Sequence, residues 1–231
     1  IVAAFLVSPT GIDADSGATI ERLYTRPESV PPVDLDVATA QWQLDGIRLG
    51  GADALAGGAT LADLDGDDDL DIDGCDYSCG TGDQTVDGGA GNDDISINMA
   101  GDHDVTGGDG NDDIEVGCDC DTEGNNTIDA GDGDDNVSIY AWGIQNVDLG
   151  SGDDSLYVEG AWNSTEDFDY GDDDITVVDA GSGDDDVTFV HNHWLDVELG
   201  SGDDTLTLNA ADLTSDDHVN GDEGADTIVL H

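Results

Sequence analysis

Apolar residues recur along most of this chain in pairs two positions apart. Eight such pairs occur between residues 70 and 230. Spacing of this kind predicts a β-strand with one buried face. The first members of the pairs are Leu70, Ile95, Ile114, Val137, Leu156, Val187, Leu206 and Ile228, and the second members are Ile72, Ile97, Val116, Ile139, Val158, Phe189, Leu208 and Leu230.

A third apolar residue lies nine places before each first member. This distance is constant, whereas successive first members are 19 residues apart at the shortest and farther apart where loops are inserted, most of all at residues 159–174. Each unit is therefore predicted to be a strand, a turn of constant length, a second strand and a variable return connection. Stacked units of this kind form an all-β fold, a parallel β-solenoid of about eight coils over residues 61–231. The third set is Leu61, Val86, Val105, Ile128, Val147, Val178, Val197 and Val219.

The constant turn carries glycine and aspartate at fixed places. When the large apolar residue is counted as the eighth place of a nonapeptide, all eight copies have glycine at the fourth place and aspartate at the sixth. Short carboxylates in glycine turns suit calcium, which takes several oxygen ligands at about 2.3 to 2.6 Å. The sixth-place aspartates, which are our candidate metal ligands, are Asp68, Asp93, Asp112, Asp135, Asp154, Asp185, Asp204 and Asp226.

Two copies match a known repeat in full. Residues 88–96 read GGAGNDDIS and residues 107–115 read GGDGNDDIE. Both fit G-G-x-G-x-D-x-U-x, where U is a large apolar residue, and they resemble the nonapeptide of the repeats-in-toxin (RTX) family. The resemblance implies a β-roll whose sixth-place aspartates bridge calcium between turns. That family binds metal on both sides of the roll, whereas only one side carries the motif here, so we expect a single row of several calcium ions along one edge and a metal-free, loop-bearing opposite edge.

The fifth place of the turn is also polar in most copies. These side chains could assist calcium or could simply solvate the turn. The segment DLDGDDDLD at 63–71 similarly resembles acidic calcium loops of other families, although its register favours a first coil over a separate site. The fifth-place candidates are Asn92, Asn111, Asp134, Asp153, Asp184 and Asp203.

The charge of the chain restricts its partners. It has 57 acidic and 3 basic residues, a formal net charge of -54. Such a chain is repelled by nucleic acid and anionic membranes and requires cations. Salt adaptation would also produce an acidic surface, but the preference for aspartate beside glycine favours calcium. Carboxylates stacked about 4.8 Å apart would repel one another, so metal binding and folding are expected to be one event.

Four cysteines lie in the predicted return connections. Cys75, Cys79, Cys118 and Cys120 are spaced C-x3-C and C-x-C, which are poor matches to structural zinc sites and favour disulfides in an extracellular or cell-surface protein. Three pairings of the four cysteines remain open.

The first residue is isoleucine, which we interpret as a mature form after removal of a targeting segment. No stretch is long and apolar enough to span a membrane.

Aromatic residues gather in or beside the same connections. They predict either a carbohydrate-binding platform or scattered anchors that cover strand ends. His191 and His193 lack an evident third metal ligand. The sequence contains no G-x-S-x-G, H-E-x-x-H or P-loop motif, so we expect no enzymatic activity. The aromatic residues concerned are Tyr140, Trp142, Trp162 and Trp194.

The two ends of the chain suggest self-association. Residues 1–60 contain prolines and all three arginines and are expected to cap the solenoid, with a cap coil beginning near Gly46, while residues 1–8 are expected to donate an apolar strand to a neighbouring copy. The last repeat, at 221–229, has nothing after it to cover it. We therefore expect a secreted, calcium-dependent structural protein that assembles head to tail into a filament, surface layer or matrix. Alternatives are an RTX-type calcium-triggered secretion or folding module of a larger enzyme or adhesin, and a carbohydrate-binding adhesin.

Overall fold

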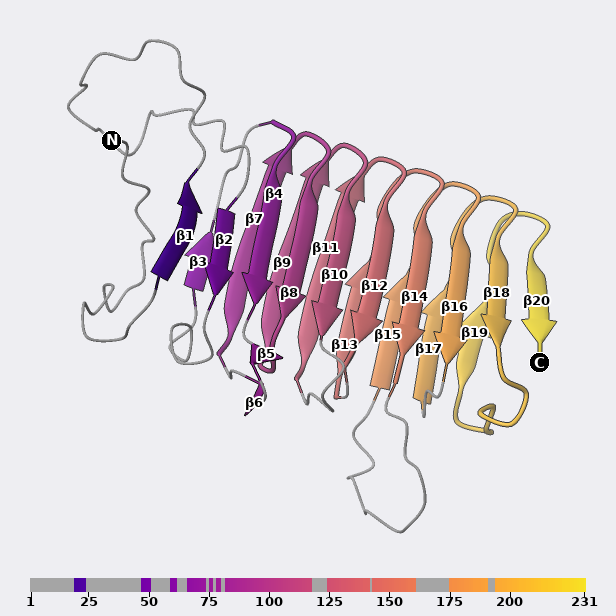
Figure 1. Ribbon diagram of the computed structural model, residues 1–231. Helices are drawn as coiled ribbons and strands as arrows, with labels where there is room; N and C mark the ends of the chain where they lie inside the picture. Colours follow the sequence, from indigo (N-terminus) through magenta and orange to yellow (C-terminus); the bar gives the residue numbers. More distant parts are fainter. Residues whose placement is uncertain are drawn as a thin grey trace.

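The computed structural model of the protein describes residues 66–73, 82–117, 124–141, 143–160, 175–190 and 194–231, and the backbone of short strands at 19–23, 47–50, 59–61, 75–76 and 78–79. All regular elements among these residues are β-strands. Two long sheets lie face to face, and the chain passes from one to the other in every coil (Figure 1). The predicted parallel β-solenoid is confirmed.

The first sheet holds the strands that follow each aspartate turn. It is ten-stranded, and all its neighbouring strands are parallel except the first pair. In spatial order the strands are β1 (Thr19–Leu23), β2 (Ile47–Gly50), β4 (Asp69–Asp73), β8 (Asp94–Asn98), β10 (Asp113–Gly117), β12 (Asn136–Tyr140), β14 (Ser155–Glu159), β16 (Asp186–Val190), β18 (Thr205–Leu208) and β20 (Thr227–Leu230).

The second sheet holds the strands that precede each turn. It is eight-stranded and parallel. Its strands are β3 (Ala59–Leu61), β7 (Gln84–Ala90), β9 (His103–Asp109), β11 (Asn126–Asp132), β13 (Gln145–Asp148), β15 (Ile175–Asp179), β17 (Trp194–Glu198) and β19 (His218–Asn220).

The register of the coils follows the apolar pattern. Ile114 is paired with Ile95 on one side and with Val137 on the other, and Val105 is likewise paired with Val86 and Ile128. A shift by one residue would turn these side chains outward, so burial of one face fixes the register. The apolar pairs from Leu70 to Leu208 in the first sheet and the third set from Val86 to Val197 in the second sheet therefore form one continuous core between the sheets. Ile228 and Leu230 of the last coil are exposed.

The first described coil is covered at one edge by an additional pair of strands. β2 is parallel to β4, with Ile47 opposite Leu70, and β1 is antiparallel to β2. This arrangement lies where the sequence predicted a cap coil, and it covers the backbone edge of β4. The segment 1–8, to which the donor strand was assigned, lies outside the described residues.

The return connections are described only in part. β5 (Cys75–Asp76) and β6 (Ser78–Cys79) form a small hairpin with Cys75 opposite Cys79, while Cys118 and Cys120 lie outside the described residues. The cysteine pairing therefore stays a prediction.

Two of the aromatic residues assigned to the return edge are described. Tyr140 projects from the outer face of the first sheet and contacts Tyr157, with ring centroids 5.9 Å apart. Trp194 projects from the outer face of the second sheet and is 39 % exposed. These two residues lie on opposite outer faces and share no platform. Trp142, Trp162, His191 and His193 lie outside the described residues.

Candidate functional site

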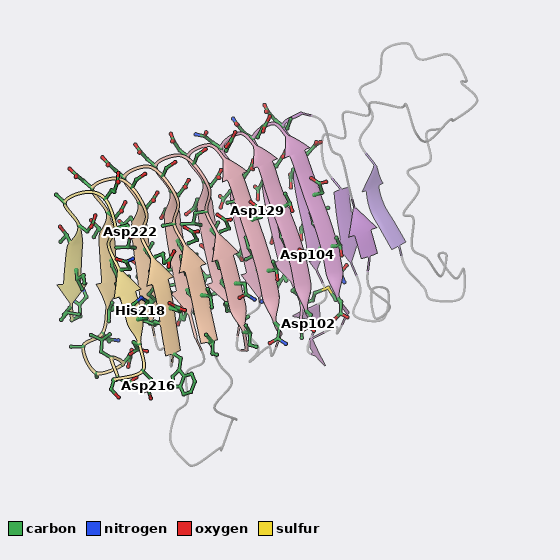
Figure 2. The ribbon with its side chains drawn as sticks, turned by 180° about the vertical axis from the view of Figure 1, so that it is seen from behind. Asp102, Asp104, Asp129, Asp216, His218 and Asp222 are labelled. Carbon is green, nitrogen blue, oxygen red and sulfur yellow. The ribbon has the colours of Figure 1, made fainter. Side chains whose placement is uncertain are left out.

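The turns that connect the second sheet to the first form a continuous edge, which we call the aspartate edge. Figure 2 shows the side chains of these turns in a row at the strand ends remote from Asp102. At the fourth place, Gly91 has a φ of +147° and Gly152 a φ of +142°. A Cβ on Gly152 would overlap the carbonyl of Gly133 in the preceding coil. Glycine is thus required here by backbone conformation and by close stacking.

The sixth-place aspartates form a hydrogen-bonded ladder along this edge. The backbone N–H of Asp93 donates to Oδ1 of Asp112 at 2.9 Å, and the N–H of Asp112 donates to Oδ1 of Asp135 at 2.8 Å. The same bond joins every described pair of successive coils, from Asp68 to Asp226. All of these aspartates are buried except Asp226, which is in the last coil. The sequence-predicted ligands therefore lie together in one row.

The fifth-place residues form a second ladder with the opposite direction. The N–H of Asn111 donates to Oδ1 of Asn92 in the preceding coil at 2.9 Å, and the N–H of Asp153 donates to Oδ1 of Asp134 at 3.0 Å. From Asp93 onward, each sixth-place carboxylate instead accepts its bond from the preceding coil. The fifth-place side chains are exposed and brace the turns from the solvent side.

One oxygen of most buried sixth-place carboxylates is left over. Oδ1 accepts the ladder bond, but Oδ2 is buried and has no hydrogen-bond partner in the described part of the chain. A buried ionised oxygen without a partner is costly, so it calls for a bound proton or a cation. The aspartates with such an oxygen are Asp93, Asp112, Asp135, Asp154, Asp185 and Asp204.

The electrostatics of the row reflect this burial. Burial, with a contribution from neighbouring carboxylates, raises the pKa of Asp154 to about 7 and the pKa values of Asp112 and Asp185 to about 6. Burial likewise raises the pKa values of Asp93, Asp135 and Asp204. The ladder bonds oppose these shifts because they stabilise the charged form. Without a cation, the protonated acid is therefore favoured up to about pH 7 at Asp154 and up to about pH 6 at Asp112 and Asp185.

Backbone oxygen lies close to the leftover carboxylate oxygen in some turns. An added Cβ on Gly88 would lie 2.7 Å from Oδ2 of Asp93 and 2.6 Å from the carbonyl oxygen of Gly107 in the next coil. In the described ranges, no three His, Cys, Asp or Glu side chains converge where they could hold a metal ion. A metal at this edge would thus need carbonyl ligands beside the carboxylate. An all-oxygen set of this kind fits a hard cation such as calcium.

The opposite edge repeats the same turn with neutral residues, which our sequence analysis missed. Gln84, His103, Asn126 and Gln145 are buried and occupy one register. The N–H of His103 donates to Oδ1 of Asn126 at 3.1 Å, as in the aspartate ladder. Asn126 Nδ2 donates to Oε1 of Gln145 at 2.8 Å, and Gln145 Nε2 donates to the Gly124 carbonyl at 3.1 Å. At Asn126, the amide Nδ2 therefore stands where the aspartates of the other edge have the unpartnered Oδ2.

The outer ladder is reproduced on this edge as well. The N–H of Asp102 donates to Oδ1 of Asp83, and the N–H of Asn125 donates to Oδ1 of Asp102 at 2.8 Å. The signal was present in the sequence, since a glycine stands two places before each of Gln84, His103 and Asn126. The repeat was not recognised because the residue two places after the glycine differs in type from coil to coil. The two edges therefore share a backbone design but differ in charge.

No protein-family model, no curated protein and no solved structure matches this chain. Within the described ranges, no helix is long and apolar enough to cross a membrane.

Proposed function

We propose that the protein is an extracellular structural protein whose solenoid is stabilised by calcium along the aspartate edge. The observation that carries this proposal is the row of buried carboxylates from Asp93 to Asp204, in which Oδ2 has no hydrogen-bond partner among the described residues. Calcium supplies positive charge and accepts both carboxylate and carbonyl oxygens as ligands. The sixth-place aspartates, with Asp112 as the clearest example, would hold it.

The overall charge supports a cation requirement. A chain with a net charge of -54 has almost no basic side chains to neutralise stacked carboxylates. Parallel strands are spaced about 4.8 Å apart, so each carboxylate is close to those of the neighbouring coils. Bound divalent ions would convert this repulsion into attraction between coils. The resemblance of residues 88–96 and 107–115 to the RTX nonapeptide favours calcium as that ion.

A structural role is supported by the last described coil. Ile228 is 54 % and Leu230 is 53 % exposed, and they stand in register above Leu206 and Leu208. The outer edges of β19 and β20 are not paired within the described residues. Because this face repeats the internal stacking pattern, it is suited to a coil of the same kind. We propose that a second copy stacks there, with β20 meeting the β1 end of its neighbour.

Circular dichroism tests the calcium requirement. In chelator the chain should lose most of its β signal, and the signal should return with calcium but not with sodium at equal ionic strength. Equal β content in all three solutions would assign the acidic composition to salt adaptation.

Sedimentation velocity in saturating calcium tests the assembly. Species that grow with concentration are expected, and Ile228→Asp should prevent their growth while the calcium-bound fold remains. A chain that stays monomeric at high concentration would exclude the filament and favour a calcium-triggered module of a larger protein.

A further inference from the structure

The chain contains three N-x-S/T sequences that the calcium proposal does not use. They begin at Asn125, Asn136 and Asn163, and the last of these lies outside the described residues. In an exported protein such a sequence is a potential acceptor of an N-linked oligosaccharide, which is attached at an exposed asparagine. The sequence pattern treats Asn125 and Asn136 alike, but the fold places them differently.

Asn125 stands at the opposite edge of the solenoid, directly before β11. Asn125 and Thr127 are both exposed, and Asn126 between them is buried. Alternate residues of an extended segment point to opposite sides. The two side chains that the N-x-S/T sequence requires therefore face solvent together.

The amide group of Asn125 is half occupied. Its Oδ1 accepts a hydrogen bond of 2.9 Å from the N–H of Ile144, and its backbone N–H donates to Oδ1 of Asp102 at 2.8 Å. Its Nδ2 makes no hydrogen bond to the described part of the chain. A substituent on Nδ2 thus leaves both ladder bonds of this residue intact.

The space around this amide is open to solvent. Figure 2 shows Asp102, the preceding residue of the same outer ladder, at the strand ends on the side remote from the aspartate edge. A substituent at Asn125 would extend away from the solenoid on that side. It would not reach the aspartate row or the exposed face of the last coil.

Asn136 is also exposed, but its amide is engaged. It is the first residue of β12 and is paired with Asp113 on one side and Ser155 on the other. Its Nδ2 donates to Oδ1 of Asp113 at 2.8 Å. Neighbouring strands are about 4.8 Å apart, so a sugar on this nitrogen would displace the bond and crowd the outer face of the first sheet.

We propose that Asn125 carries an N-linked oligosaccharide in the exported protein and that Asn136 does not. The donor is a lipid-linked sugar phosphate. The amide nitrogen forms a bond to C1 of the sugar, the bond from C1 to the phosphate oxygen breaks, the lipid phosphate leaves, and the nitrogen loses one proton to a base. This inference rests on the proposed extracellular location and adds a modification to the edge opposite the calcium row.

Mass spectrometry of the full chain, purified from the cells that produce it, tests the proposal. The peptide with Asn125 should carry the mass of a glycan, and enzymatic release in heavy-oxygen water should convert Asn125 into a labelled aspartate. The peptide with Asn136 should have its unmodified mass. Equal occupancy of the two asparagines would show that the fold does not select the acceptor and would overturn the proposal.

Matched variants made in the same cells test the role of the N-x-S/T sequence. Thr127→Ala should abolish the glycan while the ladder bonds of Asn125 remain, and Thr127→Ser should retain it. Ser138→Ala, the corresponding change beside Asn136, should leave the mass of the glycan unchanged. A Thr127→Ala chain that still carries the sugar on Asn125 would contradict this assignment.

The failure of this inference can be distinguished from the failure of the proposed function. An exported chain that folds in calcium but has no sugar at Asn125 would refute the modification alone. A chain found only inside the producing cells would contradict the extracellular role and the modification together. Circular dichroism of the Thr127→Ala chain should show the same calcium dependence as the unmodified sequence, since the two edges are separate.

Discussion

The backbone N–H of Asp135 donates a hydrogen bond of 2.8 Å to Oδ1 of Asp154 in the next coil. This bond ties two coils together, and it also fixes the Asp154 carboxylate in a buried place where Oδ2 has no hydrogen-bond partner among the described residues. The ladder that aligns the coils thus creates a need for positive charge. The first three predictions below concern the balance between these two effects.

The first prediction concerns pH in the absence of calcium. Burial raises the pKa of Asp154 to about 7 and the pKa values of Asp112 and Asp185 to about 6, from an ordinary value of 3.8. Between these values the folded state binds more protons than the unfolded state, so stability is greatest in acid and falls as pH rises. In chelator, the β signal that remains in circular dichroism should be larger near pH 5 than near pH 8. A β signal that increases over this interval would contradict the burial of these groups.

Calcium provides the control for that experiment. The ion binds the deprotonated carboxylate, so saturating calcium should weaken or reverse the loss of stability at higher pH. The same pH series with sodium at matched ionic strength should retain the loss. Identical pH profiles with calcium and with sodium would show that the carboxylates do not bind the divalent ion.

The buried position that Gln84, His103, Asn126 and Gln145 share on the opposite edge should not tolerate a charge. Asn126→Asp replaces an amide N–H that donates to Gln145 Oε1 with an oxygen that faces it. We expect a loss of about 3 kcal/mol in unfolding free energy by urea titration in calcium at neutral pH, in line with a buried unpaired charge. Asn125→Asp is the matched control. Its exposed Oδ1 accepts a bond from the N–H of Ile144, and aspartate preserves that acceptor, so the change should be small.

The fourth place of the turn should accept only glycine. Gly152→Ala places a Cβ at a positive φ and against the Gly133 carbonyl. The unfolding free energy should fall by well over 1 kcal/mol, since the new residue does not suit the native conformation. Ser151→Ala, one residue earlier, removes only an exposed bond of 2.7 Å to Asp132 and should change stability by less than about 0.5 kcal/mol.

The core prediction follows from the register alone. Leu156 is buried between Val137 and Val187 in the first sheet, so Leu156→Ala should cost about 2 to 5 kcal/mol through lost burial and a residual cavity. The neighbouring exposed residue supplies the comparison, because Ser155→Ala should change stability by only a few tenths of a kcal/mol. Equal effects of the two substitutions would contradict the assigned register.

The coil and its register could be predicted because two constraints act together. The alternation at Ile95 and Ile97 determines which face of the strand is buried. The constant nine residues from Val86 to Ile95 determine which residues of the two sheets face each other. Both constraints depend on residue type and spacing, which the sequence states directly. The rows of sixth-place and fifth-place residues follow from the same register.

The chemistry of the site was less accessible. The directions of the two ladders depend on which backbone N–H faces which carboxylate, and spacing does not determine this. The sequence did not reveal that Gln145 belongs to a buried row on the opposite edge, because the residue at this position changes among glutamine, histidine and asparagine from coil to coil.

Calorimetric unfolding across a calcium series at mildly alkaline pH tests the central claim most directly. If the aspartate edge binds calcium in the folded state, the Tm must rise steadily with the logarithm of free calcium concentration, because a ligand of the folded state stabilises it by mass action. Magnesium at the same concentrations should give a smaller rise, since it demands a tighter octahedral site. A Tm that is the same in chelator and in saturating calcium would contradict the account.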